Sequence, residues 1–89
     1  NSVNLPDINL YKDSNTIRLT IINKNNPGVI SYITDIFSSY NINIQQQVNK
    51  SQDEIAYNIF DLESFPDNNK ELLEKLDNNN DIIKVRIIS

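Results

Sequence analysis

The sequence predicts an α+β sandwich in which two helices cover one face of an antiparallel, four-stranded sheet. Apolar residues alternate with polar ones, or form short apolar runs, in four segments, and they recur with a helical period in two others. The six segments follow the order β-α-β-β-α-β, which is that of the ferredoxin-like sandwich. Right-handed crossovers then place both helices on the same face and the strands in the order 4-1-3-2.

The chain divides into a linker and one domain. Residues 1–15 show neither period clearly and contain many turn-forming residues, so we expect a linker there. Residues 16–89 form the domain, since a chain of 89 residues is too short for two hydrophobic cores. Its first strand begins near Thr16, and alternation over residues 17–21 predicts its extent.

A helix is expected after the first strand. Its apolar face consists of Val29, Ile33, Ile36, Phe37 and Tyr40. Pro27 suits the first helical turn, where a missing N–H costs nothing. Asn41 follows the last periodic residue, and asparagine tolerates the left-handed conformation that often ends a helix.

The second half of the domain reads as a hairpin, a helix and a strand. Strands are predicted at 42–48 and 54–62, joined by a polar turn over 49–53. Asp67 is the expected N-cap of a helix that carries Leu72, Leu73 and Leu76 on one face. Residues 82–88 supply the last strand. In the predicted strand order, segment 42–48 is a sheet edge that is open to pairing with another chain.

The composition excludes several functions. Eight basic and twelve acidic residues give a net charge of −4, which disfavours nucleic acid as a partner. Without cysteine or histidine, the chain lacks a thiolate nucleophile, the commonest general base and the commonest neutral metal ligand, so we expect no catalytic and no metal site. The apolar runs are too short for a membrane span. We expect a cytoplasmic domain, and the lack of methionine indicates a piece of a longer protein.

The loop that leads into the first predicted helix is a candidate anion site. Backbone N–H groups at a helix start, together with the helix dipole, favour a carboxylate or a phosphate. Gly28 has no side chain to block close approach, and Asn25 offers an amide donor and an acceptor. A plain structural turn explains the same residues, and the pattern alone leaves both interpretations open.

The segment "NKNNPGV", placed after a strand and before a helix, resembles the ligand loop of the ACT domain, an amino-acid-sensing module attached to metabolic enzymes. A narrower resemblance covers almost the whole chain. The stretches "SVNLPDINL", "IRLTIINKNNPGVISYITDIFSSYNINIQQQ" and "YNIFDLE" are similar to the C-terminal serine-binding regulatory domains of D-3-phosphoglycerate dehydrogenases.

This resemblance implies a ligand site shared by two paired domains, with L-serine as the ligand. It places the ligand-binding residues at Asn23, Asn25, Gly28, Val29, Ile30 and Asn43. Asn43 would act across the interface of a homodimer that pairs through its edge strands. Asn23 stands where the family has a histidine. That departure leaves another small amino acid open as the ligand.

The resemblance also implies what surrounds the domain. Catalytic domains upstream would carry an NAD-dependent oxidoreductase of serine biosynthesis, while this fragment would hold no cofactor and serve feedback regulation. Two other functions stay open. One is an architectural dimerisation module without a ligand. The other is an RNA-binding domain of the same element order, which the spacing of Tyr57 and Phe60 disfavours, because residues three apart on a strand face opposite sides. An enzyme in its own right fits the chain least.

Overall fold

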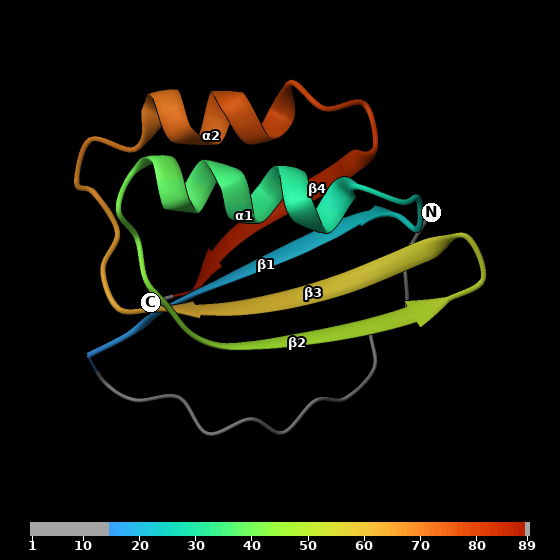
Figure 1. Ribbon diagram of the computed structural model, residues 1–89, viewed down its shortest axis with the longest axis horizontal. Helices are drawn as coiled ribbons and strands as arrows, with labels where there is room; N and C mark the ends of the chain where they lie inside the picture. The colour runs from blue at the N-terminus through green and yellow to red at the C-terminus, as the bar shows by residue number, and fades with distance from the viewer. Residues whose placement is uncertain (1–14, 89) are drawn as a thin grey trace.

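The computed structural model describes residues 15–88 and confirms the predicted sandwich. Both helices lie together on one face of a single sheet (Figure 1). The strands are β1 (Ile17–Lys24), β2 (Ile44–Gln52), β3 (Ile55–Leu62) and β4 (Ile82–Ile88), and the helices are α1 (Val29–Ser39) and α2 (Lys70–Asp77). Every strand pair is antiparallel. Residues 1–14 of the predicted linker lie outside the described residues.

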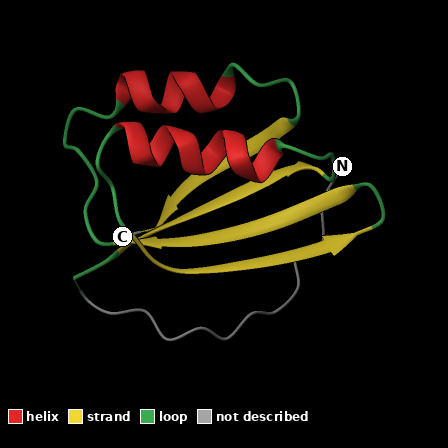
Figure 2. Ribbon diagram, in the orientation of Figure 1, coloured by secondary structure: helices red, strands yellow, loops and turns green. Residues whose placement is uncertain are grey.

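The strand order is β2-β3-β1-β4, as predicted, so β2 and β4 are the two edges of the sheet. The helices leave the other face of the sheet uncovered (Figure 2). The alternation of the strands divides the side chains between the two faces. Phe60 lies on the helix side, where it is fully buried, whereas Tyr57 lies on the opposite face and is half-buried. The predicted separation of these two aromatic residues is confirmed.

The hydrophobic core fills the space between the helices and the sheet. Phe37 of α1 meets Phe60 of β3 edge-on, with the ring centroids 5.3 Å apart and the ring planes at 75°. Such a contact contributes about 0.5–1.5 kcal/mol beyond the area that it buries. The other buried members of this core, including Ile42 from the connection between α1 and β2, are Leu19, Ile21, Val29, Ile33, Ile36, Ile42, Leu62, Leu72, Leu76 and Ile82. This packing fixes where α1 begins relative to the end of β1.

Several predicted strand ends were wrong. β2 begins at Ile44 and not at residue 42, and β3 begins at Ile55 and not at residue 54. β1 continues beyond residue 21 to Lys24, because Asn23 finds a buried partner and so stays within the sheet. β2 continues through most of the predicted polar turn, and the turn is only Asp53-Glu54. Asp53 has a φ of 58°, in the left-handed region that aspartate tolerates better than most residues.

Helix ends were predicted with mixed success. α1 begins at Val29 with Gly28 as its N-cap, so Pro27 lies before the helix and its predicted place in the first helical turn was wrong. Asn41 follows the C-cap with a φ of 57°, which confirms Asn41 as a left-handed helix stop. The N-cap of α2 is Asn69 and not Asp67, so that prediction was wrong. Three cap-forming residues follow one another there, and the helix begins where Leu72 and Leu76 both reach the core.

Candidate ligand site at the start of helix α1

The backbone at the start of α1 presents unpaired donors. The N-cap is Gly28, with a φ of 88° and a ψ of −11°, and no side chain caps the helix. The first bond of the helix joins the Tyr32 N–H to the Gly28 carbonyl over 3.0 Å. The N–H groups of Val29 and Ile30 precede that bond, so the helix itself offers them no acceptor. No acidic residue occupies the first turn, so the positive end of the dipole is not neutralised there.

Space in front of these donors is open. The loop residues Asn25 to Gly28 are exposed, Ile30 is half-buried, and only the side chain of Val29 is buried. A Cβ atom built on Gly28 would meet no heavy atom within 4 Å. A carboxylate can therefore approach the helix start closely.

Three hydrogen bonds to two neighbouring segments hold the loop. The Lys24 N–H donates to the Asp81 carbonyl over 2.7 Å, at the entry to β4. The Asn25 N–H donates to the Glu54 carbonyl over 2.7 Å, at the hairpin turn. The Asn26 side chain reaches Asp81 Oδ1 over 3.2 Å. Such anchoring lowers the ordering cost of binding, because the loop is fixed before a ligand arrives.

Asn23 is placed differently from the loop residues. It lies within β1 and is only 2% exposed. Its Oδ1 atom accepts a hydrogen bond from Asn58 over 2.7 Å, and its Nδ2 atom donates to the Lys24 carbonyl over 2.9 Å. Both ends of the amide are thus occupied within the chain. The resemblance implies that Asn23 contacts the ligand. In the structure, Asn23 is instead buried in β1, just before the loop of residues 25–28, and its amide bonds within the chain.

Two residues next to the site were missed by sequence reasoning. Asn58 of β3 is fully buried and bonds to Asn23, and Asn49 of the edge strand donates to Asn58 Oδ1 over 2.6 Å. A signal for them was present in the apolar stretch "IAYNIFDL", where one asparagine interrupts a buried strand. A buried amide requires hydrogen-bond partners, so another asparagine on a neighbouring strand was to be expected.

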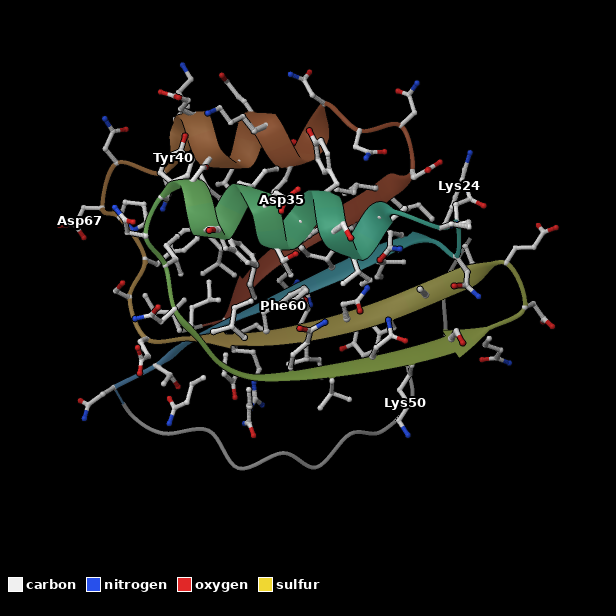
Figure 3. All side chains as sticks on the ribbon, viewed as in Figure 1. Lys24, Asp35, Tyr40, Lys50, Phe60 and Asp67 are labelled. Carbon is white, nitrogen blue, oxygen red and sulfur yellow. The ribbon has the colours of Figure 1, made fainter. Side chains whose placement is uncertain are left out.

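Asn43 lies at the far end of α1. The helix starts beside Lys24 and ends beside Tyr40 (Figure 3). Its 11 residues span about 16 Å at 1.5 Å per residue. One chain therefore brings Asn25 together with the amides of Gly28, Val29 and Ile30, but it keeps Asn43 away from them.

The surroundings of Asn43 are open. Its side chain is exposed, and its carbonyl accepts the Glu63 N–H over 3.0 Å. A shallow concavity of about 260 Å³ lies between α1 and the entry to β2, lined by Thr34, Phe37, Ser38, Asn41, Ile42, Asn43 and Ile44.

A buried ion pair stabilises the opposite face of the sheet. Arg18 of β1 donates from Nε and Nη2 to the two carboxylate oxygens of Asp61 on β3, over 2.7 and 2.9 Å. The side chain of Asp61 is 2% exposed and that of Arg18 is 14% exposed. The hydrogen bond to Asp61 raises the pKa of Arg18, which therefore stays charged at any physiological pH. This pair belongs to the scaffold and lies away from the ligand loop.

Other kinds of site receive no support from the described part of the chain. Within residues 15–88, no group of three or more His, Cys, Asp or Glu side chains is placed to hold a metal ion. Neither helix in that range has the length and apolar character that crossing a membrane requires. The start of α1 is the site that the geometry favours.

Comparison with known sequences identifies the relatives of the chain. The family described as "AHAS small subunit-like ACT domain" matches residues 19–84. D-3-phosphoglycerate dehydrogenase 2 of Saccharomyces cerevisiae is 35% identical over 92 residues, covering 98% of this chain and 19% of the yeast protein. The D-3-phosphoglycerate dehydrogenase of Haemophilus influenzae is 32% identical over 87 residues, covering 98% of this chain and 21% of that protein. The chain spans about a fifth of the length of these relatives.

Comparison with solved structures confirms the fold. The ACT domain from GTP pyrophosphokinase of Chlorobium tepidum has a TM-score of 0.65 and 21% identity, covering 82% of this chain and 96% of that one. The regulatory subunit of aspartate kinase from Thermus thermophilus has a TM-score of 0.68 and 15% identity, covering 89% of this chain and 54% of that one. At such low identity, the likeness concerns the fold alone.

Proposed function

Because the chain belongs to the ACT domain family, we propose that it is a regulatory domain that binds L-serine between two copies of itself. Its relatives that are D-3-phosphoglycerate dehydrogenases support this ligand class, since L-serine is the end product expected to regulate such an enzyme. In this proposal, the longer protein is an NAD-dependent oxidoreductase of serine biosynthesis. NAD and the catalytic residues would then belong to parts of the protein outside this chain.

The observation that carries the proposal is the open helix start. The uncapped amides of Val29 and Ile30 and the glycine that leads into them suit a carboxylate. Asn25, exposed beside them, has an amide oxygen for an ammonium group and an amide nitrogen for a hydroxyl. A small zwitterion such as serine needs both kinds of partner.

Pairing of two copies would complete the site. β2 is an edge strand of nine residues without proline. If two β2 strands pair antiparallel about a twofold axis, the two α1 helices also run antiparallel, side by side. The end of one α1 then lies next to the start of the other, which brings the partner's Asn43 to the ligand at Asn25.

Regulation follows from a ligand shared by two domains. A serine that contacts both copies stabilises their paired arrangement and so restricts the movement of whatever the domains are attached to. Couplings of this kind are typically about 1–3 kcal/mol, which changes an affinity or population by about 5- to 150-fold. That range is sufficient for feedback control.

The position of Asn23 favours a second candidate ligand. Because its amide is bonded to Asn58 and to the Lys24 carbonyl, it extends no group toward the helix start. The family places a histidine there, so this site has lost one side-chain contact. An ACT domain that binds a different small amino acid is the alternative that this geometry supports.

The melting temperature of the domain tests the proposal. Binding to the folded state alone adds about 2.7 kcal/mol of stability at a ligand concentration a hundredfold above Kd. We expect L-serine to raise the melting temperature, with D-serine as the matched control that lacks the correct geometry. A shift with glycine or L-alanine but not with L-serine would identify a different ligand. If no amino acid shifts the transition, the domain is an architectural pairing module.

A further inference from the structure

A row of three asparagine side chains crosses the sheet beneath α1. Asn49 on β2 donates to Asn58 on β3 over 2.6 Å, Asn58 donates to Asn23 on β1 over 2.7 Å, and Asn23 donates to the Lys24 carbonyl over 2.9 Å. We propose that this amide chain positions the ligand loop (residues 25–28) and makes it sensitive to the state of the β2 edge.

The amide chain has a fixed direction. The Lys24 carbonyl can only accept, so Asn23 must turn its NH₂ group to it and its oxygen to Asn58. Asn58 must then donate to Asn23 and present its own oxygen to Asn49. Asn49 in turn donates to Asn58, which leaves the Asn49 side-chain oxygen for a partner outside this polypeptide. Each amide sets the orientation of the next.

The inner end of the amide chain coincides with the pivot of the ligand loop. The Lys24 carbonyl accepts from Asn23 and also from the Asn26 N–H over 2.8 Å. This second bond closes the tight bend that contains Asn25. A change in the orientation of Asn23 would therefore alter the bend that presents Asn25 to a ligand.

Burial couples the hydrogen bonds of the amide chain to one another. Asn58 is 0% exposed and Asn23 is 2% exposed, so neither can exchange a lost partner for water without opening the fold. Asn49 is exposed, at the edge where a second copy would pair. If Asn49 stops donating, the buried oxygen of Asn58 loses its partner. The least costly response is rotation of the inner amides, which withdraws the Asn23 donor from Lys24.

Replacing Asn49 by aspartate tests this directly. Asn49→Asp keeps the shape of the side chain but removes the donor that Asn58 needs. Ser51→Asp is the matched control, because it adds the same charge to the same strand at an exposed position two residues along. The measurement is hydrogen exchange of the Asn26 N–H, with the NMR signals of the Asn23 side-chain NH₂ group as a second readout, both without ligand.

We expect Asn49→Asp to speed exchange of the Asn26 N–H about fivefold, the change that corresponds to losing one ordinary hydrogen bond. The Asn23 NH₂ signals should shift in the same variant, and Ser51→Asp should change neither. Equal effects of the two variants would overturn the proposal, as would an unchanged Asn26 rate in Asn49→Asp.

Only the effect on ligand affinity rests on the proposed function. Where an amino acid binds, Asn49→Asp should weaken it about fivefold while Ser51→Asp leaves it within twofold. Equal affinities in the two variants would refute the link to the ligand. If no amino acid binds the unmodified domain, the proposed function fails, and the exchange measurement still decides whether the amide chain controls the loop.

Discussion

Asn25 and Asn43 stand at opposite ends of α1, the first before its N-cap and the second after its last turn. An amino acid is much shorter than the roughly 16 Å length of an 11-residue helix, so it cannot contact both residues of one chain. A ligand that uses both must therefore take Asn25 from one chain and Asn43 from another. This relation makes the composition of the site testable.

Mixing two variants that each bind weakly should restore tight binding at some sites. Asn25→Ala and Asn43→Ala should each weaken ligand binding by about 1–3 kcal/mol, since each variant leaves a ligand group unpaired. A dimer with one chain of each kind contains one site with both asparagines missing and one site with both present. Titration calorimetry of the mixture should thus show tight sites at up to a quarter of the number in the unmodified protein, because half of randomly formed dimers are mixed. A mixture that binds no better than its components would show that Asn25 and Asn43 do not meet in a site shared by two chains.

Substitutions at Gly28 should separate bulk from backbone strain. Gly28 has a φ of 88°, which costs a residue with a Cβ about 1–2 kcal/mol and costs asparagine less than valine. The added side chain points into open space, so it opposes the ligand and not the core. We expect Gly28→Val to abolish serine binding while lowering the unfolding free energy by about 1–2 kcal/mol. The comparison with Gly28→Asn, measured by calorimetry and urea unfolding, shows how much of the loss comes from bulk. Unchanged affinity in Gly28→Val would move the site elsewhere.

The sequence alone predicted most of the fold because its periodic segments are clear. The alternation that begins at Ile17 and the helical spacing from Val29 to Phe37 fixed the type and order of the first elements. Topological rules then supplied the strand order. The left-handed Asn41 followed from local residue chemistry, whereas Pro27, expected in the first helical turn, lies before the N-cap.

The sequence patterns did not predict where the polar segments join the strands or which side chains they bond. Asn23 and Asn49 resemble loop residues in isolation, yet both belong to strands because Asn58 lies between them. That relation depends on the register of three strands, which no local pattern contains. For the same reason, the resemblance could place Asn23 at a ligand position without revealing that its amide is used within the chain.

Removing Arg18 should destabilise the domain strongly. Its guanidinium bonds both carboxylate oxygens of Asp61, whose side chain is only 2% exposed. Arg18→Leu leaves a buried carboxylate without its cation, which typically costs about 3–5 kcal/mol. Arg18→Lys should recover part of this loss but not all, because lysine lacks the two-pronged geometry. Urea unfolding at neutral pH measures both variants. Equal stability of Arg18→Lys and the unmodified domain would show that charge alone matters.

The pH dependence of this pair has a definite sign. The pKa of Arg18 is raised, so its contribution to stability is complete below its ordinary pKa and is lost only as the pH rises beyond the raised value. The stability difference between the unmodified domain and Arg18→Leu, measured by urea unfolding at several pH values, should therefore show no step from the titration of Arg18 across the neutral range.

A proline in β2 should separate pairing of two chains from folding of one. The two-residue turn makes Gln52 and Ile55 a hydrogen-bonded pair, and such pairs alternate along an antiparallel ladder. Val48 then bonds to β3, whereas the N–H of Gln47 faces outward, toward a chain that would extend the sheet. Gln47→Pro removes that outward donor and places a ring at the edge without breaking a bond to β3.

We expect the unmodified domain to be a dimer and Gln47→Pro to be a folded monomer in sedimentation equilibrium at the same concentration. Gln47→Ala is the control, because it removes the same side chain and keeps the N–H, and it should remain dimeric. The circular dichroism of all three should agree. The monomer should also lose affinity for the amino acid, since it lacks the partner's Asn43. A dimeric Gln47→Pro variant, or an unmodified domain that sediments as a monomer, would show that β2 is not the pairing edge.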